Sequence, residues 1–131
     1  MKRLIMSFVI VLMGIMTSNA QTLRKEGSGI ASNKIEAYYF HFNARCETCR
    51  AVEAEAKAAI ETLYPGRATF KAVNLDDASS KSIAEKLKIS GQTLLVVKGD
   101  KQVNLTNEGF MYATTNPAKL KSIIKQKVDN L

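Results

Sequence analysis

The stretch IEAYYFHF, residues 35–42, constrains the fold more than any other part of the sequence. It is almost continuously apolar and rich in aromatic residues. A strand with one face in water alternates apolar and polar residues, whereas a strand covered on both faces gives a continuous apolar run. We therefore expect residues 35–42 to form a central strand of an α/β sheet.

An amphipathic helix is predicted directly after this strand, starting at two cysteines. Its apolar positions recur at helical spacing on one face: Cys49, Val52, Ala56, Ile60 and Leu63. The polar positions between them, Glu53 included, are expected on the other faces. The Tyr-Pro-Gly triplet at 64–66 is typical of the end of a helix.

A second strand and a shorter helix follow. Residues 68–75 alternate well enough to form a strand, and the helix after it carries Ile83, Leu87 and Ile89 on its apolar face. The start of this helix is ambiguous by about one turn. Residues 76–79 offer turn and cap chemistry, but Ser82 and Glu85 would form a capping box.

The last third of the chain predicts a hairpin and a final helix. Two β-rich runs within residues 93–105 flank Gly99-Asp100, a pair suited to a hairpin turn. A loop around residues 110–112 is expected next. Asn116 then caps a helix with an apolar stripe and many lysines off the stripe.

The expected order of elements is therefore β-α-β-α-β-β-α. A strand–helix–strand unit joined to a hairpin and a closing helix predicts a central mixed sheet of about four strands flanked by helices on both faces. The first crossover should be right-handed, with parallel strands. No internal repeat is found, and residues 35–131 are expected to form a single domain.

The N-terminal residues 1–20 have the pattern of a signal peptide. Lys2 and Arg3 precede an apolar run that ends at Met16, and small residues follow up to Ala20. The alternative is a retained membrane anchor, but the run is shorter than the roughly 20 residues that a spanning helix needs. We therefore expect cleavage near Ala20, a periplasmic or secreted protein, and membrane contact only through an uncleaved signal. Residues 21–34 are expected to form a flexible lead-in.

The charge of the chain argues against nucleic acid as a partner. Loss of Lys2 and Arg3 with the signal would leave 17 basic residues against 12 acidic ones. This surplus is modest and scattered, whereas nucleic-acid binding favours basic clusters with interleaved aromatic residues. No such cluster is found.

Cys46 and Cys49, the only two cysteines of the chain, form a C-x-x-C motif where the first strand meets the first helix. The spacing is compatible with redox exchange, with a thiolate metal site or with a structural bridge. A bridge over so short a loop constrains the unfolded chain little. In a β-α context the motif favours redox chemistry.

The position of each cysteine predicts its role. Cys46 is expected at the helix N-terminus, where backbone N–H groups and the helix dipole favour a thiolate. Arg45 and Arg50 should support that thiolate, and Glu47 should oppose it. Cys49 lies one turn further on, on the buried face. The exposed Cys46 would then attack a partner disulfide, and Cys49 would resolve the mixed disulfide.

The sequence resembles the thioredoxin superfamily over about residues 35–130. Four segments carry the resemblance: YYFHFNARCETC, FKAVNLDD, KISGQTLLVVKGD and NPAKLKSIIKQKV. It implies a thioredoxin-like three-layer sandwich, Cys46 as nucleophile and Cys49 as resolving cysteine. It also implies a protein disulfide or dithiol as substrate, a redox partner protein, and no cofactor besides the redox-active disulfide. The motif YYFH…RC.TC is also similar to small exported thioredoxin-like proteins encoded beside arsenic-resistance or nitroreductase genes.

The chain departs from the thioredoxin pattern at five positions, in three parts of the sequence. Arg45 and the pair Glu47-Thr48 replace the usual neighbours of the cysteines, and Phe40 stands where thioredoxins keep a buried acid. Gln92 stands where the family has a cis-proline facing the cysteines. The resemblance implies substrate contact by this loop and by the residue before the first cysteine: Gly91, Gln92, Thr93 and Arg45.

Two alternatives to an oxidoreductase stay open. Without the proline, the reduced pair Cys46 and Cys49 could hold a soft ion such as Cu(I), Zn(II) or trivalent arsenic. Such a site would need His41, a partner chain or low coordination, because structural zinc takes four ligands. His41 itself is expected to be a hydrogen-bonded core residue that points away from the cysteines. The second alternative is a non-catalytic adaptor with a thioredoxin fold.

Overall fold

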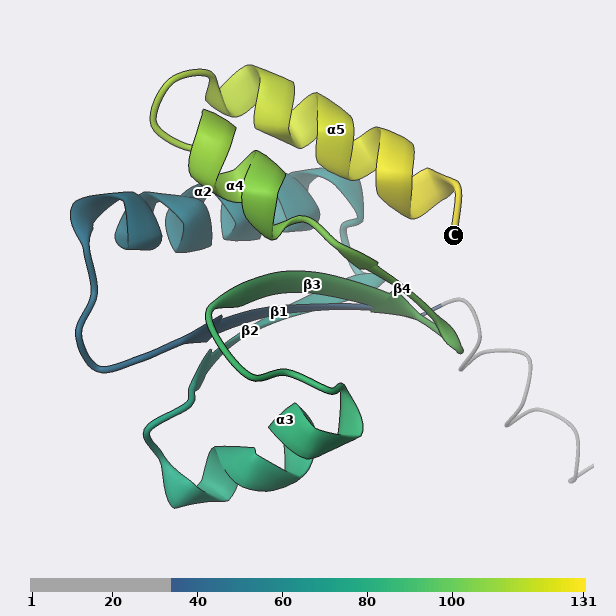
Figure 1. Cartoon of the computed structure of the whole chain (residues 1–131). Helices are drawn as coiled ribbons and strands as arrows, with labels where there is room; N and C mark the ends of the chain where they lie inside the picture. The colour runs from purple at the N-terminus through teal and green to yellow at the C-terminus, as the bar shows by residue number, and fades with distance from the viewer. Residues whose placement is uncertain (1–33) are drawn as a thin grey trace, which may run out of the picture.

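The computed structural model describes residues 34–131, which form a four-stranded mixed sheet with helices on both faces (Figure 1). The strand order is β2-β1-β3-β4. The bounds of the strands are β1 Ile35–His41, β2 Ala68–Asn74, β3 Thr93–Lys98 and β4 Lys101–Asn104. β1 pairs parallel with β2 and antiparallel with β3, and β3 pairs antiparallel with β4. The predicted mixed sheet is therefore confirmed.

The helices divide between the two faces of this sheet (Figure 1). Helices α2, α4 and α5 lie on one face, whereas η1 and α3 lie on the other. Their bounds are α2 Glu47–Leu63, η1 Ala78–Ser80, α3 Lys81–Lys86, α4 Thr106–Tyr112 and α5 Pro117–Asp129. This arrangement is the predicted three-layer sandwich.

The central position of β1 follows from its apolar sequence. Ile35, Ala37 and Tyr39 pack into the core beneath α2, α4 and α5, whereas Tyr38 and Phe40 pack toward α3. All five residues are at least 93% buried. Residues 37–40 are covered on both faces, which explains the near absence of alternation in the strand, whereas Glu36 near its start stays partly exposed and pairs with Lys34.

One helix was predicted to be a loop. Residues 106–112 form α4, in which Gly109 is buried, and Leu105 and Ala113 flank it at a spacing of four residues. An added Cβ on Gly109 would lie 3.0 Å from Cγ1 of Val52, so the glycine allows α4 to approach α2 closely. A seven-residue helix with an internal glycine has weak intrinsic propensity, and packing stabilises it instead.

The predicted helix caps had mixed outcomes. The capping box of Ser82 and Glu85 is wrong, because α3 begins at Lys81 and Ser82 lies inside it. The cap of α5 is confirmed: Oδ1 of Asn116 accepts a 3.0 Å hydrogen bond from the N–H of Lys119, and Pro117 occupies the first turn. The hairpin turn at Gly99 is confirmed as well, with φ at 63°.

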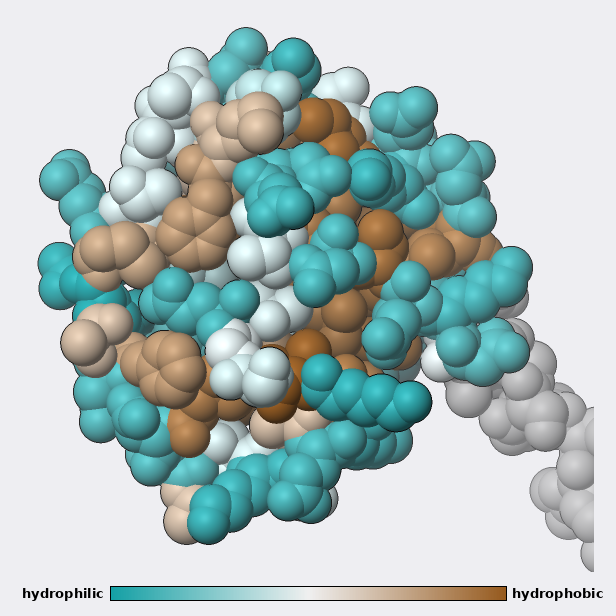
Figure 2. Space-filling view, viewed as in Figure 1, coloured by the Kyte–Doolittle hydropathy of each residue, from teal (hydrophilic) through white to brown (hydrophobic). Residues whose placement is uncertain are grey.

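On the side of the domain seen in Figure 2, hydrophobic residues are interspersed among hydrophilic ones. Within residues 34–131 two large hydrophobic side chains are exposed, Phe42 and Met111. No helix in this part of the chain is both long enough and apolar enough to cross a membrane. The predicted signal peptide and almost all of the lead-in lie outside the described residues.

A buried tyrosine ties the C-terminal end of α2 to α5. The hydroxyl of Tyr64 donates a 2.8 Å hydrogen bond to Oδ1 of Asp129, and Lys125 pairs with the same carboxylate. Hydrogen bonds from Lys125 and Tyr64 lower the pKa of Asp129. Burial and the bond to Asp129 raise the pKa of Tyr64.

Replacing Tyr64 with Phe should lower the free energy of unfolding at neutral pH by about 1 kcal/mol, because it removes this hydrogen bond. The lowered pKa of Asp129 stabilises the fold above the unfolded value of 3.8, and this contribution is lost as the pH falls. Urea denaturation should therefore show a smaller effect of the substitution at about pH 3 than at about pH 7. An equal effect at both pH values would contradict the role of the Asp129 carboxylate.

Candidate active site

The two cysteines form a disulfide at the N-terminus of α2. Cys46 is the N-cap residue, and its Sγ accepts a 3.1 Å hydrogen bond from the N–H of Cys49. Cys46 is exposed, whereas Cys49 is only 3% exposed. The predicted placement of both residues is thus confirmed. An anionic sulfur at position 46 would meet the same N–H group and the positive end of the helix dipole.

The loop that leads from β1 to Cys46 is held against the end of β2. The backbone N–H of Asn43 donates a 2.6 Å hydrogen bond to Oδ2 of Asp76, and Nδ2 of Asn74 donates a 2.6 Å bond to Oδ1 of Asn43. These contacts join the loop to residues more than thirty positions away in the sequence. They position the start of α2, and with it Cys46, at the carboxyl ends of the two parallel strands.

Gln92 lies directly against the buried cysteine. Its Nε2 is 3.5 Å from Sγ of Cys49, and its Oε1 is 3.8 Å from the same sulfur. A disulfide sulfur carries no hydrogen, so Nε2 is the donor in the oxidised state. A reduced Cys49 thiol could instead donate to Oε1. The amide can therefore contact both redox states of the pair.

The rest of this loop is compact. Oγ1 of the buried Thr93 donates a 2.9 Å hydrogen bond to the carbonyl oxygen of Gly91. Gly91 is partly buried, and an added Cβ would meet no atom within 4 Å. None of the described peptide bonds is cis. The structure thus brings Gln92 against Cys49, with Gly91 and Thr93 flanking it in the chain, and contact of these three residues with a substrate stays a prediction.

Arg45 does not extend into solvent. Its guanidinium forms an ion pair with the carboxylate of Glu53, and the two side chains are only 23% and 27% exposed. Part of the positive charge expected beside Cys46 is thereby neutralised. Arg50 and Glu47 are exposed on either side of the cysteines. The predicted contact of Arg45 with substrate stays a prediction.

Among residues 34–131, two buried side-chain polar atoms have no hydrogen-bond partner: Oη of Tyr39 and Nε of Arg45, a member of this ion pair. Burial raises the pKa of the Tyr39 hydroxyl, and the charge of Arg45 opposes that rise. Sequence reasoning missed both Tyr39 and Glu53. A signal for Glu53 was present, since it follows Cys49 by four residues and so lies near it on the helix surface.

His41 is partly buried at the end of β1, so the prediction of a core histidine holds only in part. Its Nδ1 donates a 3.0 Å hydrogen bond to the carbonyl oxygen of Phe42, and its ring lies 6.2 Å from that of Tyr39. Within residues 34–131, no three His, Cys, Asp or Glu side chains lie together in a group that could hold a metal ion.

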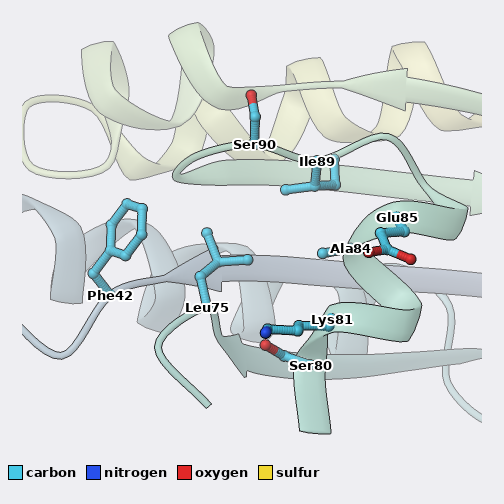
Figure 3. A pocket seen from close by; sticks show the side chains of 8 residues that line it. All are labelled: Phe42, Leu75, Ser80, Lys81, Ala84, Glu85, Ile89 and Ser90. Carbon is cyan, nitrogen blue, oxygen red and sulfur yellow. The ribbon is translucent and has the colours of Figure 1, made fainter. Parts of the chain in front are cut away.

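A recess of about 350 Å³ opens beside the Gln92 loop, between the end of β1 and α3 (Figure 3). Phe42 and Leu75 line one side of it and Ala84 the other, with Ile89 above. Polar side chains complete the lining: Ser80, Lys81, Glu85 and Ser90. Ser90 stands two positions before Gln92, so the recess adjoins the loop that contacts the disulfide.

No protein-family model and no curated protein matches this sequence, but several solved structures resemble the fold. Trxlp from Edwardsiella tarda EIB202 is 19% identical, with 72% of this chain and 84% of that chain covered and a TM-score of 0.51. The thioredoxin Deadhead of Drosophila melanogaster is 17% identical, with 73% and 83% covered and a TM-score of 0.47. The thioredoxin of Trypanosoma brucei brucei is 16% identical, with 76% and 80% covered and a TM-score of 0.46. The likeness is one of fold, and the narrower resemblance to arsenic-resistance or nitroreductase-associated proteins stays a prediction.

Proposed function

Because the chain has a thioredoxin-like fold with a C-x-x-C disulfide at the start of its first helix, we propose that it is an exported thiol–disulfide oxidoreductase. The observation that carries the proposal is the unequal exposure of the two sulfurs at one helix N-terminus. Only Cys46 is accessible to a partner protein. Cys49 lies beside Cys46, as it must if it is to attack a mixed disulfide formed between Cys46 and the partner.

The reaction consists of two exchanges. In the reduced protein the Cys46 thiolate attacks one sulfur of a partner disulfide, forms a mixed disulfide and expels the partner's other sulfur as a thiolate. The Cys49 thiolate then attacks Sγ of Cys46, closes the observed disulfide and releases the partner's remaining thiolate. Two electrons pass to the partner, and a separate reductant must return them. In the opposite direction the same steps oxidise a partner dithiol.

The surroundings of the disulfide favour a protein substrate. The 91–93 loop is compact, and the side-chain amide of its Gln92 contacts the sulfur of Cys49. The adjoining recess and the exposed Phe42 offer apolar surface for a partner side chain.

The proposal is tested by reduction of insulin with dithiothreitol as electron source, together with alkylation of the reduced protein by iodoacetamide across pH. We expect turnover above the rate of dithiothreitol alone. We also expect a first alkylation midpoint below the ~8.5 of an unperturbed thiol, since the helix N-terminus stabilises the Cys46 thiolate. An ordinary midpoint together with no turnover would refute the proposal.

The soft-metal alternative is tested on the same reduced protein. Titration with arsenite and with Zn(II) measures whether the thiols bind an ion, and the Cys46–Cys49 reduction potential is measured with and without each ion. Tight stoichiometric binding without insulin reduction would replace the oxidoreductase proposal with a binding function. Turnover that the ions only inhibit would support the oxidoreductase.

Export is proposed from the N-terminal pattern and has its own test. The chain is expressed in a bacterium with its first twenty residues, and the protein recovered from the periplasm or medium is sequenced from its N-terminus. We expect the mature chain to begin at Gln21. Recovery of the intact chain in the cytosol would contradict export.

A further inference from the structure

The sulfur of Cys49 must carry a negative charge in the second exchange step, because the thiolate is the nucleophile. The residue is only 3% exposed, and burial disfavours the charged form of a thiol. The backbone N–H of Cys49 does not stabilise charge on this sulfur, because it donates to Sγ of Cys46 instead. A hydrogen-bond donor from another part of the chain is therefore needed.

The side-chain amide of Gln92 supplies such a donor. Its Nε2 lies 3.5 Å from Sγ of Cys49, and its Oε1 lies 3.8 Å from the same sulfur. In the part of the chain that the structure describes, no other side chain forms a hydrogen bond with this sulfur. Gln92 therefore contacts one of the two protein atoms that react in the second step.

The sheet holds this amide in place. Thr93, the next residue, begins β3 and pairs with Phe40 near the end of β1. Its hydroxyl also donates to the carbonyl oxygen of Gly91, so the backbone is fixed on both sides of Gln92. A donor that a rigid element already directs at the reacting atom needs little reorganisation when charge develops there.

Charged side chains at α2 and on the helices packed against it form no hydrogen bond with Cys49 within residues 34–131. Several of them are paired with one another: Arg45 with Glu53, Glu108 with Lys127, and Lys125 with Asp129. Arg50 is exposed at the start of α2. The neutral amide of Gln92 is thus the polar side-chain group in contact with the sulfur that becomes charged.

A hydrogen bond from this amide favours the thiolate over the other states of Cys49. A donor binds a charged acceptor about twice as strongly as a neutral one. The disulfide sulfur that Nε2 contacts in the structure is neutral. The same contact therefore becomes stronger when Cys49 loses its proton, and it weakens again when the disulfide closes.

We infer that Gln92 is a catalytic residue of the second exchange, in which its Nε2–H donates to the Cys49 thiolate. The inference rests on the proposed exchange reaction. In the mixed disulfide, the Cys49 thiol releases its proton to solvent, and the amide stabilises the thiolate that remains. The thiolate attacks Sγ of Cys46, the bond from Cys46 to the partner breaks, and the partner leaves as a thiolate. The amide itself neither gains nor loses a proton.

The test separates the two steps with dithiodipyridine, an uncharged aromatic disulfide, in a stopped-flow spectrometer. Mixed with the reduced protein, it releases one equivalent of absorbing thione when Cys46 attacks and a second when Cys49 resolves the mixed disulfide. Gln92→Met keeps the length of the side chain without the donor, and should slow the second phase about threefold while the first is unchanged. Loss of a hydrogen bond to a charged group lowers the thiolate population about tenfold, and the greater nucleophilicity of a more basic thiolate offsets about half of this on a logarithmic scale.

Two further variants keep this test decisive. Gln92→Glu keeps the shape of the side chain but puts a carboxylate beside the thiolate, so it should slow the second phase by about tenfold or more. Gln126→Glu makes the same charge change at an exposed position of α5 and should match the wild type. Circular dichroism checks that each variant is folded, and Gln92→Glu carries the test if Gln92→Met does not fold.

Three results would overturn the inference. The first is an equal second-phase rate in the wild type and both Gln92 variants. The second is a faster second phase in Gln92→Glu, which would mean that removal of the proton limits the step. The third is an equal slowing of both phases in Gln92→Met, which a purely structural role would produce. Absence of insulin reduction by the wild type would instead refute the proposed function, so the two failures are distinguishable.

Discussion

Cys46→Ser is expected to reduce insulin turnover to the rate of dithiothreitol alone, whereas Cys49→Ser is expected to accumulate mixed disulfides. The reason is the unequal exposure of the two sulfurs. Cys46 is the exposed sulfur at the N-cap of α2 and is the only one that a partner can reach. A serine hydroxyl at this position would be neutral and a poor nucleophile at neutral pH.

Cys49→Ser removes only the second step. The first exchange still forms a covalent complex with the partner through Cys46, and without added dithiothreitol that complex persists because serine at position 49 cannot displace the partner. Non-reducing gel electrophoresis followed by mass spectrometry should show insulin chains linked to Cys46. A Cys46→Ser protein that traps a partner through Cys49, or equal loss of trapping in both variants, would contradict the assigned roles.

Gly109→Val is expected to lower the free energy of unfolding by about 1–3 kcal/mol, the range typical of overpacking a buried site. The Cβ alone would lie 3.0 Å from Cγ1 of Val52 and 3.4 Å from Cδ2 of Leu94. Two further methyl groups would force α4 away from α2 and β3. Because Val52 follows Cys49 by three residues, the displacement would also reach the start of the helix that carries the disulfide.

Asn107→Val is the matched control for this substitution. Asn107 is exposed on the same helix, so the new side chain meets water instead of the core and changes only helix propensity, by less than about 1 kcal/mol. Urea denaturation of the two variants and the wild type measures the difference. Equal stability of Gly109→Val and Asn107→Val would show that α4 does not depend on a close approach at Gly109.

The order of apolar and polar residues predicted most of the fold, because the burial of an element's faces determines where its apolar residues stand in the sequence. The continuous apolar run of β1 and the apolar stripe of α2 each indicate which faces are covered, and both elements form as expected. Helix α4 left no comparable signal. It is short and has a glycine at its buried centre, so its stability comes from contact with Val52 and Leu94. Those neighbours are far from Gly109 in the sequence.

Some features of the candidate site could likewise be predicted from the sequence, and others are seen only in the tertiary structure. The sequence by itself determined the C-x-x-C motif, its place between a buried strand and an amphipathic helix, and therefore which sulfur is exposed. Only the tertiary structure decided that the amide of Gln92 contacts Cys49 and that Arg45 turns back to pair with Glu53. It also decided that Oη of Tyr39 and Nε of Arg45 are buried without a hydrogen-bond partner in the part of the chain that the structure describes. The physical reason is that the order of apolar and polar residues along a strand or helix indicates which of its faces are buried. Contacts between side chains far apart in the sequence depend instead on the order of the strands in the sheet and on the rotamer of each long side chain.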